Sequence, residues 1–284
     1  MKKEYLAEKG FLGAAIFSAL LTALILIFML LFSFPLFRGG SFFTLLKTPW
    51  NPDHGLFGIY PMLAGTISIV FLSLCMAFPL SLGTSILISV IAPPGLATFC
   101  KKTVQMLTGI PTVIYGFVGL FLLVPLIREM FETGSGMSIL SASLMLSIVI
   151  SPTMILFFTD TFESIPASYS AAADAMGASS VQKFIYVILP YSWNGIFAGL
   201  TLSAGRAMGD TLIALMLAGN AVAFPGSVLD SARTLTAHIA LVIAADFDSI
   251  EFKTIFAAGL VLYLFTTALI LLVRIIGGAG IKNR

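Results

Sequence analysis

Six runs of apolar residues constrain this chain more than any other feature. They lie at about 11–37, 62–91, 104–127, 137–159, 196–219 and 254–276. Each run is long enough to cross about 30 Å of hydrocarbon as a helix. Hydrophobic residues make up 58% of the 284 positions and charged residues only 10%, which is far from the average soluble protein. We therefore expect an all-α, polytopic membrane protein with about six transmembrane helices.

Charge bias orients these helices. Six spans place both termini on one side of the membrane, and the side rich in Lys and Arg is cytoplasmic. Nine basic residues fall on the side of the termini: Lys2, Lys3, Lys9, Lys101, Lys102, Lys183, Arg274, Lys282 and Arg284. Five fall on the other side: Arg38, Lys47, Arg128, Arg233 and Lys253. The sequence thus predicts a multi-pass protein of the cell membrane with both termini in the cytoplasm.

The segment 161–195 is an organised loop between two spans. Pro166 suits a helix start, and Gly177 suits the left-handed residue that ends a helix, so a short helix is expected between them. Ser179 followed by Gln182 has the form of a capping box, which predicts a second helix. Its apolar face would be formed at helical spacing by Val181, Phe184, Ile185 and Ile188. By the charge bias, this loop is cytoplasmic.

The same loop carries a recognisable motif. Three alanines, Ala171 to Ala173, precede Gly177, and Val187-Ile188-Leu189-Pro190 follows. The spacing resembles the Glu-Ala-Ala, Gly, Ile-x-Leu-Pro signature of the membrane subunits of binding-protein-dependent ABC importers, with Ala171 at the acidic position. The resemblance implies that two short helices dock on a cytoplasmic ATPase. It marks these residues for coupling: Ala171, Ala172, Ala173, Asp174, Gly177, Ala178, Leu189 and Pro190. The alternative is a pair of interfacial helices that lie on lipid headgroups.

The fifth run contains two opposite charges, Arg206 and Asp210. Either charge would cost about 2.5 to 3.5 kcal/mol at the centre of a bilayer, so neither should face lipid. One helical turn separates them, and on a continuous helix they would share a face and could pair. They could serve as an anion pathway, or merely hold the helix or a helix contact together.

Several segments narrow the resemblance to phosphate importer permeases of the PstC type. Arg206-Ala-Met-Gly-Asp-Thr211, followed by Ala218-Gly219-Asn220, looks like that family's Arg-Ala-x-Gly-Glu-Thr segment, with Asp210 in place of Glu. Thr211 favours phosphate over sulfate or molybdate. The stretch 109–116 and the residues around Trp50-Asn51-Pro52 agree. The resemblance covers about 48–276, with its core at 62–276, and implies a single permease domain of type I importer architecture over 1–284.

The third run should bend near 107–111, because Pro111 lacks an amide hydrogen and Gly109 and Gly116 loosen the helix. Carbonyls freed by a bend are tolerated against protein or a wet cavity. Thr108, Thr112 and Tyr115 would then lie near a path. A proline bend without any role in transport is the alternative.

Small residues at steps of four, from Gly195 and Gly199 to Ser203 and Ala207, predict close helix packing. The partner is either a helix of this chain or a homologous second permease subunit. In part of the outward segment 221–253, apolar residues at helical steps predict an amphipathic helix that lies on or dips into the outer interface. These residues are Ala232, Leu235, Ile239 and Val242. The family resemblance suggests that such segments meet a binding protein.

Other functions find no support in the residues. No Gly-x-x-x-x-Gly-Lys-Ser/Thr loop is present, so ATP hydrolysis is expected in another chain and no catalytic residue is assigned. His54, His238, Cys75 and Cys100 lack metal-ligand spacing, and the histidines are expected to be solvated or interfacial. We expect no metal, cofactor or nucleic acid, and a net charge of +2 agrees. The first run lacks a small-residue cleavage site and should be retained as a span.

The sequence favours a permease that forms half of a pathway for inorganic phosphate. Its expected partners are a second permease subunit, two copies of an ABC ATPase, an extracytoplasmic phosphate-binding protein and the lipid bilayer. A permease for another oxyanion or an ion-gradient-driven anion transporter are the competing readings. The second permease subunit is either a different chain or an identical copy of this one.

Overall fold

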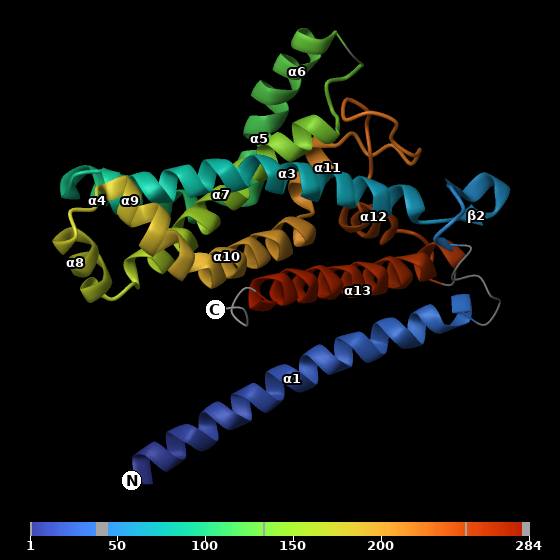
Figure 1. Ribbon diagram of the computed structural model, residues 1–284. Helices are drawn as coiled ribbons and strands as arrows, with labels where there is room; N and C mark the ends of the chain where they lie inside the picture. The colour runs from blue at the N-terminus through green and yellow to red at the C-terminus, as the bar shows by residue number, and fades with distance from the viewer. Residues whose placement is uncertain (1, 38–44, 133, 248, 280–284) are drawn as a thin grey trace.

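The computed structural model describes residues 2–37, 45–132, 134–247 and 249–279 (Figure 1). The α-helices are α1 (Lys2–Phe37), α3 (Tyr60–Ile86), α4 (Pro94–Thr108), α5 (Thr112–Val118), α6 (Val124–Phe131), α7 (Ile139–Glu163), α8 (Ala167–Ala175), α9 (Ser180–Lys183), α10 (Leu189–Gly209), α11 (Leu212–Leu217), α12 (Leu235–Val242) and α13 (Ile250–Ala279). Three π-helical turns, η2 (Leu87–Ile91), η3 (Gly119–Leu123) and η4 (Phe184–Ile188), extend or join them. Two short strands, β1 (Trp50–Asn51) and β2 (Leu56–Phe57), pair antiparallel around the 3₁₀ turn η1 (Pro52–His54).

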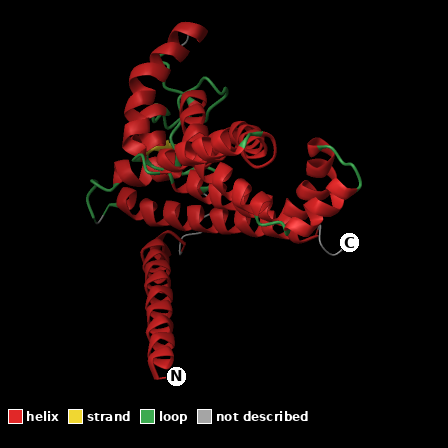
Figure 2. Cartoon of the chain, turned by 90° about the vertical axis from the view of Figure 1, so that its left-hand side faces the viewer, coloured by secondary structure: helices red, strands yellow, loops and turns green. Residues whose placement is uncertain are grey.

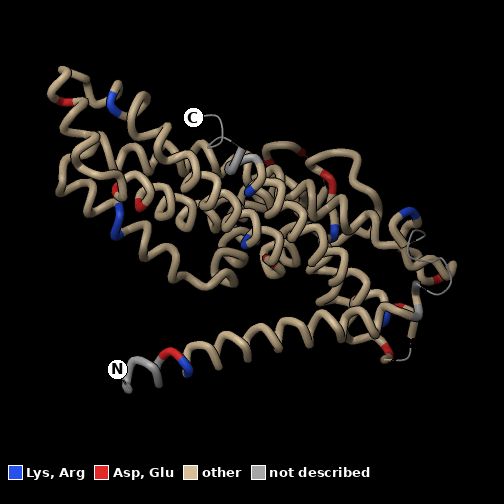
Figure 3. The backbone as a smooth tube through the Cα atoms, turned by 60° about the horizontal axis from the view of Figure 1, so that its bottom comes forward, with Lys and Arg blue, Asp and Glu red and all other residues tan. Residues whose placement is uncertain are grey.

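The predicted helical membrane protein is confirmed. Six helices within the described ranges are long and apolar enough to cross a membrane: Glu8–Phe34, Tyr60–Ile91, Thr112–Phe131, Ile139–Glu163, Ser180–Gly209 and Ile250–Ile275. Charged residues gather mainly at the two ends of the bundle, with long uncharged stretches between them (Figure 3). This distribution is the one that a hydrocarbon layer requires.

Helix α7 is the centre of the bundle. In its most apolar stretch 72% of the residues are buried, a far larger share than in any other span of the described chain. Ile150, Met154 and Phe158 on α7 are fully buried and form the main core with residues of α3, α10 and α11. Serine hydroxyls join α3 and α7 directly: Ser143 donates to the Ile69 carbonyl at 3.3 Å. Hydroxyl bonds of this kind hold membrane helices together where the hydrophobic effect cannot.

Two spans leave the bundle. Helix α1 diverges as a separate rod in Figures 1 and 2, and its apolar window is not buried at all. It meets α13 near one end, where Phe32 stacks on Phe256 with centroids 4.9 Å apart and Met29 lies against Gly259. Helix α6 rises away from the other helices (Figure 1), whereas α5 stays packed on α11 through Gly116.

The third and fifth spans differ from their predicted limits. The bend predicted near 107–111 is confirmed and is a complete break, because α4 ends at Thr108 and α5 begins at Thr112. The third span is therefore Thr112–Phe131 rather than 104–127. The fifth span runs over Ser180–Gly209 instead of 196–219, since the helix of the loop continues into it through η4.

The close packing predicted for the fifth span is confirmed within this chain. A Cβ atom on Gly199 would come within 2.9 Å of the Phe158 ring on α7, and one on Gly195 would overlap the Thr161 side chain. Gly205 and Gly209, by contrast, have no atom within 4 Å of such a Cβ. The stripe that starts at Gly195 therefore packs on α7, and these last two glycines face open space.

The outward segment contains the predicted helix as α12, and it corrects one prediction. The first part of α12 is covered by this chain, because Leu235, Ala237 and His238 are all 0% exposed. Its side chains pack into a second core with Trp50, Ile59 and other residues. His238 is therefore not solvated: its ring lies 4.4 Å from that of Trp50, edge to face. Helical spacing alone could not show that the hairpin β1–β2 region covers this helix.

Candidate functional site

The fifth span ends in a polar break. Helix α10 stops at Gly209, Asp210 is extended with ψ at 129°, and α11 begins at Leu212 after Thr211. The Asp210 carboxylate accepts a hydrogen bond from the Ile213 amide at 2.9 Å, so it caps α11. Aspartate favours helix starts and glycine is a weak helix former, and together they explain why the apolar run breaks here.

The predicted pairing of Arg206 with Asp210 is wrong. Arg206 instead donates from Nη1 to the Thr153 hydroxyl of α7 at 2.7 Å, and the ion pairs among described residues do not include it. Because Asp210 lies beyond the end of α10, the two side chains do not occupy successive turns of one helix. The charges remain close enough to interact electrostatically. Nothing in the sequence pointed to Thr153 as the partner.

Of the three side chains predicted around the break at 109–111, only that of Tyr115 is shown to interact with this region. Tyr115 on α5 interacts electrostatically with Arg206, and its hydroxyl donates to the Leu107 carbonyl at 3.1 Å across the break. Thr108 donates to the Gln105 carbonyl of its own helix, and Thr112 is the first residue of α5. Gly116 allows the close approach of α5 to α11, because its missing Cβ would lie 2.6 Å from the Met216 sulfur.

The loop that follows α11 makes hydrogen bonds that stabilise the break between α10 and α11. Gly219 and Ala232 form a parallel bridge, and Asn220 adopts a left-handed backbone with φ at 60°. Arg233 donates from Nε to the Asn220 carbonyl at 3.1 Å, and Thr236 donates to the Asp210 carbonyl at 2.8 Å. Burial lowers the pKa of Arg233. Sequence reasoning missed Thr236 because helical spacing gave no signal for a contact across 26 residues.

The other candidate site is the loop 161–195 at the opposite end of α10. Pro166 precedes α8, Gly177 is left-handed with φ at 74°, and Ser179 forms a full capping box with Gln182. All three local predictions are confirmed. The predicted second helix, however, has no separate end, because α9, η4 and α10 follow one another without a break. The loop and the fifth span are therefore joined in one uninterrupted helical segment.

The residues marked for coupling lie on an exposed surface. Helix α8 buries no residue, and Met176 is 89% exposed. Ala171, Ala172 and Asp174 are exposed, whereas Ala173 and Ala178 are half-buried, and Leu189 and Pro190 begin α10. The predicted apolar face is divided: Phe184 and Ile188 are buried in the core, but Val181 and Ile185 stay exposed. The loop therefore presents apolar side chains that this chain does not cover.

Ion pairs brace this end of the bundle. Lys183 pairs with Asp174 at 2.6 Å, which ties α9 to α8. Lys101 on α4 contacts Glu163 at 2.7 Å and Asp160 at 3.1 Å at the end of α7. The hydrogen bond that Lys101 donates to Glu163 raises the pKa of Lys101. These pairs connect α4, which ends just before the break at 109–111, to the end of α7, which leads into the loop 161–195.

Residues 101–279 match the model of the family described as "Binding-protein-dependent transport system inner membrane component". The chain belongs to this family. It is therefore a permease subunit of an ABC importer and a multi-pass protein of the inner membrane.

Curated relatives carry related names. The "Probable ABC transporter permease protein YqgH" of Bacillus subtilis is 33% identical over 79% of this chain and 74% of its own length. The "Phosphate transport system permease protein PstC" of Pasteurella multocida is 30% identical over 92% of this chain and 88% of its own. PstC of Haemophilus influenzae is 29% identical over 84% of this chain and 80% of its own.

Solved structures share the fold. A bacterial alginate ABC transporter in complex with a periplasmic protein superposes with a TM-score of 0.68 at 14% identity, covering 96% of this chain and 93% of that one. The inward-facing MetNI methionine ABC transporter gives a TM-score of 0.60 at 18% identity, over 76% of this chain and 93% of that one. The substrates named for these two transporters differ, so the common feature is the importer permease architecture.

Proposed function

We propose that this chain is one half of the membrane pathway of an ATP-driven importer for inorganic phosphate. The pathway is formed with a homologous second permease subunit. Two copies of a cytoplasmic ABC ATPase act on the loop 161–195, and an extracytoplasmic phosphate-binding protein delivers substrate. Both termini then lie in the cytoplasm, on the same end of the bundle as α8 (Figure 1).

The proposal that the substrate is phosphate rests on the polar break at Arg206 and Asp210, taken together with the PstC names of the relatives. Arginine holds phosphate oxygens through a planar fork of donors. Phosphate keeps a proton at neutral pH and sulfate does not, so a carboxylate could accept a hydrogen bond from phosphate alone. Since Arg206 is bound to a neutral hydroxyl rather than to Asp210, its charge is not cancelled by a direct ion pair.

The roles of the remaining path residues follow from their positions. Tyr115 lies near Arg206 and would line the same path. Thr211 separates α10 from α11, while Thr108 and Thr112 flank the break of the third span. Each of these breaks frees backbone carbonyls from the regular helix pattern, and Tyr115 and Thr236 bond those of Leu107 and Asp210. Membrane proteins tolerate such breaks against protein or beside a wet cavity.

Radiolabelled phosphate uptake tests the proposal. Proteoliposomes would contain this chain with its copurified ATPase and permease partners, with ATP inside or outside and binding protein on the opposite face. We expect uptake that requires ATP, survives a proton ionophore and resists excess sulfate and molybdate. Competition by sulfate or molybdate would favour another oxyanion. Uptake that stops with the ionophore and ignores ATP would favour an ion-gradient-driven transporter.

A further inference from the structure

Arg233 is a second arginine near the polar break, and most of its hydrogen-bonding capacity is unused. The side chain is half-buried just before α12, and its Nε donates to the Asn220 carbonyl at 3.1 Å. A guanidinium carries five N–H donors, and the remaining donors of Arg233 have no partner among the residues that the structure describes. Asp230, the acidic residue nearest in sequence, accepts the amides of Gly226 and Ser227 at 2.8 Å each. None of the ion pairs in the described chain involves Arg233.

The backbone that presents Arg233 is held against α3. A Cβ atom on Gly65 would lie 2.5 Å from the Arg233 carbonyl oxygen, so the two backbones are in close contact. The Leu235 amide donates to the Thr66 hydroxyl at 2.9 Å and fixes the start of α12 on the same helix. A charged group on a fixed backbone is suited to binding, because little ordering is needed when a ligand arrives.

Arg206 and Arg233 lie at different depths. Arg206 is bound to Thr153, which is 14 residues from the start of α7, whereas the Arg233 backbone contacts Gly65, five residues from the start of α3. At 1.5 Å per residue these positions are about 21 Å and about 8 Å from the ends of the two helices. Both ends face outward in the orientation given under the proposed function. Arg233 is therefore the outer of the two cations.

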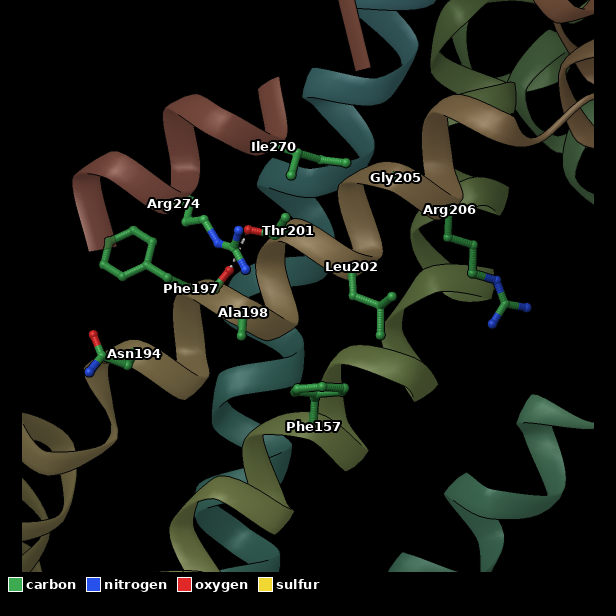
Figure 4. A pocket seen from close by; sticks show the side chains of 10 residues that line it. All are labelled: Phe157, Asn194, Phe197, Ala198, Thr201, Leu202, Gly205, Arg206, Ile270 and Arg274. Carbon is green, nitrogen blue, oxygen red and sulfur yellow. Dashed lines mark hydrogen bonds between the residues drawn. The ribbon is translucent and has the colours of Figure 1, made fainter. Parts of the chain in front are cut away.

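The two cations also act on different neighbours. The charge of Arg206 reaches Asp210, and that of Arg233 reaches His238. A groove of about 760 Å³ between α10, α13 and α7 includes Arg206 in its lining, but the Arg206 side chain points away from the other residues drawn in Figure 4. Arg233 does not line this groove. The chain thus has two separate cationic positions, and neither is cancelled by a direct ion pair within its described residues.

We propose that Arg233 is an outer oxyanion site, which holds phosphate before the ion reaches Arg206. The inference rests on the proposed function for the ion and for its direction of travel. An ion must be bound well enough to enter and weakly enough to leave, so passage through several weak sites is expected. Because no described carboxylate pairs with Arg233, this site should take sulfate as readily as phosphate and leave the discrimination to Asp210. A carboxylate of a docked binding protein offers similar chemistry, but the half-buried position favours a small ion.

Protection from phenylglyoxal, a reagent that modifies arginine, measures this site in the unaltered chain. The permease complex would be purified in detergent without binding protein or nucleotide and treated at constant ionic strength in chloride, phosphate or sulfate. Mass spectrometry of its peptides then gives a rate for each arginine. For a site of millimolar affinity, about 10 mM phosphate or sulfate should slow the modification of Arg233 by about threefold relative to chloride. The exposed Arg128 on α6 is the matched control and should react at one rate throughout.

An unchanged rate at Arg233 in phosphate would overturn the inference. Protection that appears only after the binding protein is added would also overturn it, because a protein carboxylate would then be the ligand. Equal slowing at Arg128 would do the same, since the effect would not be local. Protection of Arg206 without Arg233 keeps the proposed function and rejects the outer site. Protection of Arg233 without Arg206 keeps the outer site and counts against the proposed path.

Three substitutions separate the charge of Arg233 from its bond to Asn220. Arg233→Lys keeps a charge and a donor, Arg233→Gln keeps a donor alone, and Arg233→Met keeps neither. Phosphate uptake should stay within about twofold in the lysine variant and fall about tenfold in the other two, as expected for the loss of one charged hydrogen bond. The melting temperature should fall only in the methionine variant. Equal uptake by the lysine and glutamine variants would restrict Arg233 to backbone support and contradict the proposal.

Discussion

At the scale of single residues, the polar groups of this chain combine a structural bond with unused chemistry. Asp210 caps α11 through one carboxylate oxygen while its charge lies near Arg206. Asn220 donates its side-chain amide to the Leu215 carbonyl at 2.7 Å and thereby supports a left-handed backbone. A substitution at such a position can fail for either reason, so substitutions must separate the two.

Two substitutions separate the cap from the charge at Asp210. Asp210→Asn keeps an oxygen for the Ile213 amide, so the thermal stability of the purified protein should stay near the original, but phosphate uptake should fall at least tenfold. Asp210→Ala removes both the capping oxygen and the charge. This variant should also lose about 1 kcal/mol of stability, as proteins that lose a helix cap do. Full uptake by the Asp210→Asn variant would restrict this residue to capping.

His238 makes the stability of the outer core depend on pH. Burial is the main cause that lowers the pKa of His238 to about 4, and the charge of Arg233 lowers it further. Neither ring nitrogen has a hydrogen-bond partner among the described residues. The folded protein therefore holds the neutral ring, while the unfolded chain takes up a proton below its ordinary pKa of 6.5. Stability from this group is complete above pH 6.5 and is lost as the pH falls toward 4.

The melting temperature in detergent should accordingly fall between pH 7 and pH 4.5. His238→Phe keeps the ring contact with Trp50 and should reduce that fall, whereas the same change at the exposed His54 should not. A pH profile that is unchanged by His238→Phe would show that another group causes the acid sensitivity.

At the scale of helices, the sequence predicted which membrane spans are present better than it predicted where the helices end or join. Apolar length located all six spans, and Pro166, Gly177 and the Ser179 box defined the loop, because these signals are local. The end of α10 at Gly209 depended on Gly209 and on the Asp210 cap, and the extension of the fifth span back to Ser180 depended on a π turn. Neither can be read from hydropathy. The partner of Arg206 is likewise a tertiary contact, made across 53 residues.

The backbone at Gly177 should limit what the loop tolerates. Its φ of 74° is a left-handed conformation, and no atom lies within 4 Å of a Cβ built there, so the strain of a side chain is conformational. Gly177→Ala should cost about 1 kcal/mol and speed amide exchange over residues 178–183. Gly177→Asn is the matched control, because asparagine tolerates this conformation. Faster exchange to the same degree in both variants would contradict this account.

At the scale of the whole molecule, two sites lie at opposite ends of α10. The exposed loop of α8 and α9 is at one end and the Asp210 break is at the other, and the helix between them packs closely on α7 through Gly195 and Gly199. A rigid helix that joins two sites can transmit movement from one to the other. The sequence predicted both sites and the resemblance predicted their roles, but it did not predict that one continuous helix connects them.

Cross-linking from the loop tests the coupling of this helix to an ATPase most directly. A photoreactive amino acid in place of Met176, which is 89% exposed, should form a covalent adduct with the ATPase subunit in membranes. The yield should change when nucleotide is added. The same residue in place of Met130, which is 65% exposed on α6 and lies on the other side by the charge bias, should form none. Absence of an ATPase adduct at Met176 while uptake remains intact would contradict the central claim.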